Sequence, residues 1–280
     1  MEILRTVGQA LSWRRAQSKA PALVPTMGAL HEGHASLMRS ARGDGAPYAV
    51  SIFVNPAQFG PGEDFDRYPR SFEEDLEVCR GEGVSAVFCP SPRDMYSDRF
   101  STEVSVNALS ENMCGASRPG HFTGVATVVM KLINIIRPSR AYFGQKDYQQ
   151  LMVIKRMVSD LNADTEVIMC PTVREDDGLA LSSRNRYLGA DERAQAPGLY
   201  AALKEGKDFV ASGEKRASVI NYRITKSINK NITLGRVDYA GVYDPETLAL
   251  KENTDGPLLL AGAVFLGNAR LIDNILANDN

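Results

Sequence analysis

The sequence predicts an α/β protein in which helices cover both faces of a parallel sheet, followed by a smaller C-terminal α+β domain. In residues 1–172, short apolar segments alternate with amphipathic ones, as they do in successive β-α-β units. One of these segments, YAVSIFV at 48–54, is rich in β-branched and aromatic residues, which is typical of an interior parallel strand. After residue 172, two helical stretches precede several closely spaced strands, which indicates a separate α+β domain over 173–280.

The elements of the first domain follow in order from their periodicity. After an immediate entry into a strand at Glu2, we expect strands at residues 22–25, 48–54, 84–89, 141–144 and 165–170. We expect helices at residues 6–18, 36–42, 71–81, 122–136 and 147–161. Ser71, with Glu74 three residues further on, predicts a capping box. Segment 122–136 is apolar on nearly every side and is followed by Pro138, so this helix should be buried and should end there.

The rest of the chain shows two further patterns. Residues 90–120 are polar and carry few strand signals. The second domain is expected to contain helices near 190–210 and 215–230 and strands near 235–243, 257–265 and 269–272.

Composition excludes several classes of protein. Of 280 residues, 44% are hydrophobic, which is too many for a disordered chain. The formal net charge is −2, which argues against a dedicated nucleic-acid binder. The longest near-apolar run, 258–267, is much shorter than the ~20 residues that a membrane span needs. The N-terminus has no apolar signal-peptide core, so we expect a cytoplasmic protein.

The four cysteines predict no metal or redox motif. Cys79, Cys89, Cys114 and Cys170 are too widely spaced to form a C-x-x-C pair. Buried free thiols are the expectation.

The segment PTMGALHEGH at 25–34 combines a strand end, a glycine turn and a helix start. His31 and His34 are three residues apart, so both imidazoles should lie on one side of the first helical turn. Unpaired amides and the positive end of the helix dipole favour an anion there, which predicts a phosphate site. A metal site is a weaker alternative, because metal-binding helices of this kind use the H-E-x-x-H spacing. Two incidental polar residues in a turn are a further alternative.

Asn55 and Gln58 follow the strand at 48–54, in the segment NPAQF. The carboxyl ends of strands in an open α/β sheet face the ligand crevice. Amide side chains can orient a carboxylate and hydroxyl groups without adding charge. An ordinary Asn-Pro turn would give the same sequence.

The segment GQKDYQQ at 144–150 follows the strand at 141–144. Lys146 could reach phosphates as a mobile point charge, and Asp147 and Gln150 share a helix face. Each also has a structural alternative, namely a solvated lysine, a helix N-cap and an exposed glutamine.

The segment LSSRNR at 181–186 lies between the two domains. Its two hydroxyl and two guanidinium groups suit the binding of a polyphosphate, and residues 176–186, with Gly178, could close as a flap. A solvated basic linker is the alternative. His121, in RPGHF, either lines the pocket or caps the helix at 122–136.

Seven segments, in order along nearly the whole chain, together resemble the pantoate–β-alanine ligase family. They are PTMGALHEGH, SIFVNPAQF, RYPRSFEEDL, RPGHFTGVATVV, AYFGQKDYQQ, DGLALSSRNRYL and GNARLIDN. The resemblance implies the nucleotidyltransferase-like superfamily, with a Rossmann-like nucleotide- and pantoate-binding domain at 1–172 and a flap over the ATP site carried by 173–280. It implies ATP-dependent condensation of (R)-pantoate with β-alanine to pantothenate through pantoyl adenylate, with release of AMP and pyrophosphate.

The resemblance also implies roles for particular residues. The expected ATP contacts are Met27, Gly28, Ala29, Leu30, His31, Glu32, Gly33, His34, Gly144, Gln145, Lys146, Asp147, Val173, Leu181, Ser182, Ser183 and Arg184. The expected catalytic residues are His34 as proton donor, His31, Lys146, Ser182 and Arg184. Gln58 is expected to contact pantoate and β-alanine, and Gln150 to contact pantoate, with Asn55 as a neighbour.

The implied partners are small molecules and a second copy of the chain, without nucleic acid or membrane. ATP is expected with Mg²⁺, for which Glu74 and Asp75 are candidate water-mediated contacts. The family implies a homodimer.

Three positions depart from the family's pattern. Leu181 stands where Met is commoner, Ala57 where Thr or Met occurs, and Gln145 where Glu occurs. Two alternatives to ligation are a nucleotidyltransferase that acts on a phosphate ester and a catalytically silent binding protein. The paired amides Gln58 and Gln150 favour a small carboxylate, because a dianionic phosphate would call for more Arg and Lys.

Overall fold

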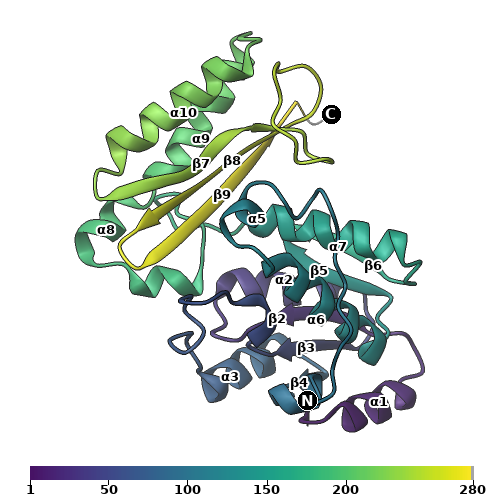
Figure 1. Ribbon diagram of the computed structural model, residues 1–280. Coiled ribbons are helices and arrows are strands. Elements are labelled where there is room, and N and C mark those ends of the chain that lie inside the picture. The colour runs from purple at the N-terminus through teal and green to yellow at the C-terminus, as the bar shows by residue number, and fades with distance from the viewer. Residues whose placement is uncertain (279–280) are drawn as a thin grey trace. The chain divides into compact units, whose positions relative to one another are not determined.

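The computed structural model describes residues 1–278, and the chain divides into two units, which Figure 1 shows. Unit 1 comprises Met1–Ser110, Arg118–Gln145 and Gln150–Pro171. Unit 2 comprises Glu111–Ser117, Lys146–Gln149 and the chain from Thr172 onward. Two short segments before residue 172 therefore belong to unit 2.

Unit 1 is built on a parallel sheet of six strands in the order β1-β4-β3-β2-β5-β6. The strands are β1 (Glu2–Leu4), β2 (Ala22–Thr26), β3 (Tyr48–Ile52), β4 (Ala86–Phe88), β5 (Arg140–Gly144) and β6 (Glu166–Cys170). The predicted α/β class is confirmed, as are the predicted strands, with their ends shifted by a few residues.

Helices cover both faces of this sheet. They are α1 (Val7–Ala16), α2 (Glu32–Gly43), α3 (Phe72–Glu82), α4 (Pro92–Met95), α6 (His121–Ile136) and α7 (Tyr148–Asp160). The crossovers through α2 and α3 run one way along the sheet and those through α1, α6 and α7 run the other way. Because such crossovers are right-handed, the two sets lie on opposite faces.

Alternation along the strands supplies the core on each face. Val24, Val50 and Val87 pack with apolar side chains of α2 and α3. Leu23 and Ala49 point the opposite way and are fully buried as well. Interior strands of this kind have no polar face, which explains the near-continuous apolar runs in the sequence.

Unit 2 contains an antiparallel sheet in the order β7-β8-β9. The strands are β7 (Gly235–Tyr243), β8 (Leu258–Leu266) and β9 (Ala269–Ala277), and the helices are α5 (Cys114–Ser117), α8 (Ala190–Gln195), α9 (Gly198–Ala211) and α10 (Ala217–Asn231). Helices α9 and α10 pack against the sheet through a buried aliphatic cluster that includes Leu203, Ile224 and Leu260.

Three local predictions need correction. Ser71 is the N-cap of α3 but makes no side-chain capping bond, because its Oγ donates to the Asp75 carboxylate instead. The helix expected at 190–210 is two helices, since Pro197 interrupts it. The last strand, expected at 269–272, continues to Ala277 through the buried polar residues Asp273 and Asn274.

Two further observations concern membrane spans and cysteines in the described part of the chain. Within residues 1–278, no helix combines the length and the hydrophobicity that crossing a bilayer requires. All four cysteines are free thiols, of which Cys79, Cys114 and Cys170 are buried and Cys89 is half-buried.

Candidate functional site

The loop between β2 and α2 has a constrained backbone. Gly28 and Ala29 both adopt left-handed conformations, with φ of 81° and 50°. In this turn, the successive amides of Ala29 and Leu30 point toward one acceptor and form a concave anion site. A Cβ at Gly28 would lie 2.8 Å from Asp75 Oδ2, so this position requires glycine for both conformation and space.

The anion in this loop is the protein's own Asp75. Asp75, on α3, is 2% exposed, and its carboxylate accepts from the Ala29 and Leu30 amides at 3.0 and 2.7 Å. Burial raises the pKa of Asp75, while the two backbone hydrogen bonds favour the ionised form and oppose that shift. The sequence predicted the glycine turn but not the carboxylate that fixes it.

His31 and His34 form the N-terminal cap of α2. His31 is the N-cap residue, and its Nδ1 accepts from the Gly33 amide at 3.1 Å. His34 Nδ1 accepts from the His31 amide at 3.3 Å. The ring centroids are 4.1 Å apart. Since both Nδ1 atoms accept hydrogen bonds, a neutral ring at either position carries its proton on Nε2.

This cap alters the predicted chemistry of the helix end. The amides of Gly33 and His34 were expected to be unpaired, but both donate to His31. An anion here would therefore be bound by imidazole Nε2–H donors and the helix dipole rather than by those amides. The structure does bring both imidazoles to one side of the first turn, as predicted.

The NPAQF segment lies against Met27. Gln58 Nε2 donates to Met27 Sδ at 2.9 Å, and Asn55 Nδ2 donates to Gln58 Oε1 at 3.2 Å. Asn55 is 1% exposed and also accepts from the Tyr96 hydroxyl at 2.8 Å. Three predicted site residues thus come together in unit 1. The amide of Asn55 orients Gln58 and also donates to the Gly124 carbonyl at 3.0 Å.

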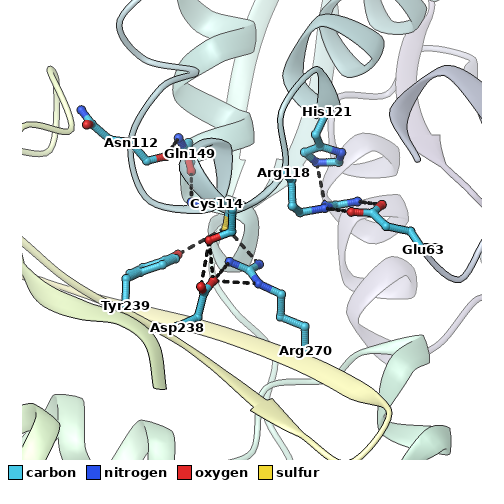
Figure 2. A network of polar contacts seen from close by, with 10 residues as sticks. Glu63, Asn112, Cys114, Arg118, His121, Gln149, Asp238, Tyr239 and Arg270 are labelled. Carbon is cyan, nitrogen blue, oxygen red and sulfur yellow. Dashed lines mark hydrogen bonds and ion pairs between the residues drawn. The ribbon is translucent and has the colours of Figure 1, made fainter. Parts of the chain in front are cut away.

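The backbone carbonyl of Gln58 is held by a second group of side chains, which Figure 2 shows. His121 Nδ1 lies 2.8 Å from this carbonyl oxygen, and its Nε2 lies 3.0 Å from Arg118 Nη1. His121 therefore donates through Nδ1, the opposite tautomer to His31 and His34. It does not cap α6, whose N-cap is Gly120.

Arg118 is in turn paired with Glu63. Arg118 Nε and Nη2 donate to the Glu63 carboxylate at 2.7 and 2.6 Å. Burial alone would raise the pKa of Glu63, but the hydrogen bonds and charge of Arg118 outweigh it, so the pKa is lowered. Sequence reasoning did not identify this ion pair.

Lys146 and Ser182 line one small pocket in unit 2. The other polar residues around it include Asn185, Tyr200 and Asp273. Ser182 Oγ accepts from the Arg184 amide at 3.3 Å and begins the short 3₁₀-helix Ser183–Tyr187. The structure therefore places two predicted phosphate-binding residues around one space within this unit.

The segment before Leu181 is a tight hairpin. The Leu181 amide donates to the Val173 carbonyl at 3.0 Å, and the Glu175 amide donates to the Leu179 carbonyl at 2.9 Å. Arg193 also binds the carboxylate of Asp177, at 2.6 Å. The hairpin is thus closed by its own backbone hydrogen bonds, and Asp177 joins it to α8 of the same unit.

The GQKDYQQ segment is divided between the two units. Gly144, Gln145 and Gln150 belong to unit 1, whereas Lys146 and Asp147 belong to unit 2. Residues Gln145–Asp147 form a 3₁₀ turn before α7.

Gln149, in the same segment, was not predicted to have a role. Gln149 is 3% exposed, accepts from the Cys114 amide at 2.9 Å and donates to the Asn112 carbonyl at 2.7 Å (Figure 2). It joins the two inserted segments of unit 2 to each other.

The acidic residues do not form a metal-binding group. Within residues 1–278, no three His, Cys, Asp or Glu side chains are placed to hold a metal ion. Asp75 is engaged by two amides and by Ser71, and Glu74 is exposed. These residues therefore do not form a resident metal centre, and the water-mediated Mg²⁺ contact expected of Glu74 and Asp75 stays a prediction.

Comparisons with known proteins agree with this architecture. Residues 2–276 match the family described as Pantoate-beta-alanine ligase. A pantothenate synthetase from Moorella thermoacetica is 51% identical over 286 aligned positions, covering 100% of each chain. One from Thermotoga petrophila is 49% identical, covering 99% of each chain.

Solved structures give the same result. The pantothenate synthetase of Thermus thermophilus superposes with a TM-score of 0.94 at 43% identity, covering 98% of this chain and 99% of that one. The Francisella tularensis pantoate-beta-alanine ligase, solved with β-γ ATP and β-alanine, gives a TM-score of 0.81 at 34% identity, covering 99% of this chain and 97% of that one. The chain belongs to the pantoate–β-alanine ligase family, whose reaction is the ATP-dependent condensation of pantoate with β-alanine.

Proposed function

We propose that this chain makes pantothenate in two steps through pantoyl adenylate. In the first step, a carboxylate oxygen of pantoate attacks the α-phosphorus of ATP, the bond from that phosphorus to the bridging oxygen breaks, and pyrophosphate leaves. In the second, the amine of β-alanine attacks the acyl carbon, AMP leaves with the bonding electron pair, and the amine gives up a proton. Neither step needs a nucleophilic side chain, so positioning and neutralisation of phosphate charge supply the catalysis.

The paired cap of α2 is the observation that carries this proposal. His31 and His34 accept backbone amides at Nδ1, which puts the proton of each neutral ring on Nε2. Two Nε2–H donors at the positive end of a 12-residue helix suit a phosphate chain. We assign His34 as the proton donor to the departing pyrophosphate, with His31 assisting.

The remaining ATP contacts are assigned to three further segments of the chain. Lys146 would bind phosphate oxygens as a point charge, and Ser182 and Arg184 would add a hydroxyl and a guanidinium. Met27 to His34, Gly144 to Asp147, Val173 and Leu181 to Arg184 remain the proposed nucleotide-binding residues. Ala29 and Leu30 are buried, and their backbone amides donate to Asp75. These two residues would therefore contribute to the nucleotide site through the shape of the loop and not through their amides.

The acceptor substrates are assigned to amide side chains. Gln58 would contact pantoate and β-alanine, and Gln150 would contact pantoate. The hydrogen bonds from Asn55 and to Met27 Sδ orient the Gln58 amide before substrate binds. Since no described acidic cluster fits a metal, Mg²⁺ would enter as part of the substrate MgATP. A homodimer, a cytoplasmic location and a division into nucleotide-binding and flap domains near residue 172 complete the proposal.

The test is pantoate-dependent exchange of radiolabelled pyrophosphate into ATP, which reports the first step alone. The wild-type protein should exchange only when pantoate is present. Lys146→Ala should lower the exchange rate about 100-fold, on the scale of one lost electrostatic contact to a developing charge. Lys207→Ala, which removes an exposed lysine of α9, is the matched control and should leave the rate unchanged. Exchange without pantoate, or wild-type exchange in Lys146→Ala, would contradict the assignment.

A further inference from the structure

Two adjacent buried polar residues interrupt the apolar pattern of β9. Asp273 and Asn274, in the GNARLIDN segment, are 4% and 3% exposed. Their strand neighbours on β8 are Gly262 and Ala261, which offer no polar side chain. Burying a carboxylate and an amide is unfavourable unless both are fully hydrogen-bonded, so their partners indicate what they do.

The partner of Asp273 is Arg174. Arg174 Nη1 and Nη2 bind the two carboxylate oxygens at 2.6 and 2.8 Å, in a bidentate pair. The same guanidinium lies over the Tyr200 ring, 3.6 Å from its centroid, and donates to the Gly178 carbonyl at 3.1 Å. Asp273 thus fixes the hairpin that ends at Leu181 and leads directly into Ser182–Arg184.

The partner of Asn274 is the main chain of Lys146. Asn274 Nδ2 donates to the Lys146 carbonyl at 3.0 Å, across 128 residues of sequence. The backbone amide of Asn274 donates to Asp273 Oδ1 at 2.8 Å, which joins the Asp273 carboxylate to the main chain of Asn274. Asp273 therefore contacts the hairpin that leads into Ser182, and its neighbour Asn274 contacts the main chain of Lys146.

We propose that Asp273 and Asn274 are positioning residues that set the spacing between Lys146 and the Ser182–Arg184 loop for the triphosphate. This inference rests on the proposed function, in which Lys146 and Ser182 contact ATP. Neither Asp273 nor Asn274 needs to touch the nucleotide. Loss of one neutral hydrogen bond usually changes an equilibrium by a few fold to tenfold, and misplacement of a catalytic group costs more.

The test is a comparison of ATP and pantoate kinetics in the exchange reaction. Asn274→Ala should lower kcat/KM for ATP about tenfold while KM for pantoate changes by less than about twofold, because the assigned pantoate contacts lie in unit 1. Asn274→Leu keeps the branching and the number of side-chain heavy atoms without the hydrogen-bonding groups, and should give the same result if the alanine variant is less stable. Thermal unfolding of both variants establishes that they fold.

A matched control and a double variant separate positioning from general stability. Asn221 also binds a backbone group of unit 2 through its side chain, the Val242 amide at 2.8 Å, but does not line the pocket. Asn221→Ala should leave kcat/KM for ATP unchanged. In a Lys146→Ala background, Asn274→Ala should have an effect of less than about twofold, since its route through Lys146 is gone.

The outcomes distinguish this inference from the proposed function. The absence of pantoate-dependent exchange in the wild-type protein would overturn the proposed function, and wild-type exchange in Lys146→Ala would overturn the Lys146 assignment on which this inference rests. Loss of exchange in Lys146→Ala together with an unchanged kcat/KM for ATP in both Asn274 variants would overturn only the inference. Equal effects of Asn274→Ala with and without the Lys146 side chain would also overturn it.

Discussion

Two buried aspartates hold the two proposed phosphate-binding segments, and they do so with different partners. In unit 1, Asp75 accepts the backbone amides of Ala29 and Leu30 and fixes the loop before the paired histidines. In unit 2, Asp273 binds the guanidinium of Arg174 and fixes the hairpin before Ser182. The first carboxylate faces neutral donors, and the second faces a cation.

This difference determines what each site loses when its carboxylate is neutralised. Without Asp75, one or two buried amides lose an acceptor, which costs the desolvation of neutral groups. Without Asp273, a largely buried guanidinium loses its counter-ion, which is more unfavourable. The β2–α2 loop is therefore held by hydrogen bonds from neutral backbone amides to Asp75. The Arg174 side chain of the hairpin is held by an ion pair with Asp273.

The largest predicted effect is at the charged pair. Asp273→Asn should lower the free energy of unfolding by about 3–5 kcal/mol, because it leaves Arg174 without a counter-ion. Urea denaturation followed by circular dichroism measures the change. Adding Arg174→Met removes the unpaired cation, so the double variant should lose less than Asp273→Asn alone. A double variant that loses as much as the sum of the two single changes would show that charge is not the reason.

The neutral pair should give a smaller effect. Asp75→Asn keeps one acceptor oxygen but turns an NH₂ group toward an amide, and should lower the free energy of unfolding by about 1–3 kcal/mol. The same urea experiment measures it. Glu74→Gln, at an exposed neighbour on the same helix, is the control and should change stability by less than about 0.5 kcal/mol.

The pH dependence of this difference provides a second measurement. Because the pKa of Asp75 in the folded protein is raised above the unfolded value of 3.8, its titration contributes stability that is complete below that pH. The contribution is lost as pH rises through the folded pKa. The stability of the wild-type protein relative to Asp75→Asn should therefore be greater at about pH 3.5 than at about pH 6. If the stability difference between the wild-type protein and Asp75→Asn grows with pH instead, the hydrogen bonds from the backbone amides outweigh the effect of burial on the pKa of Asp75.

The last comparison isolates the difference made by contact with the Asp75 carboxylate. Gly28→Ala combines left-handed strain with a methyl group 2.8 Å from Asp75 Oδ2. Gly213→Ala has the same left-handed strain, at a φ of 95°, but nothing lies within 4 Å of the added carbon. The strain should cost each variant about 1–2 kcal/mol, and the extra loss in Gly28→Ala measures the clash. Equal losses in the two variants would show that the carboxylate moves freely away.

Much of the fold follows from local patterns in the sequence. Short, near-continuous apolar segments that alternate with amphipathic helices predicted the parallel sheet, and Pro138 follows the end of α6 as expected. The three-residue spacing of His31 and His34 predicted their shared position on one turn. The errors arose where a polar residue is buried. Asp273 and Asn274 made β9 look four residues long instead of nine, since only tertiary partners make such residues tolerable in a strand.

The sequence by itself therefore determined the α/β class, the order of the strands and helices along the chain, and the segments to which we assign the chemistry. These are properties of neighbouring residues, and hydrophobic periodicity and turn residues report them directly. Only the tertiary structure decided which carboxylate holds which segment. Asp75 lies 46 residues from Ala29, and Asp273 lies 99 residues from Arg174. Partners so distant in sequence are chosen by strand order and helix packing, which leave no local periodicity for the sequence to reveal.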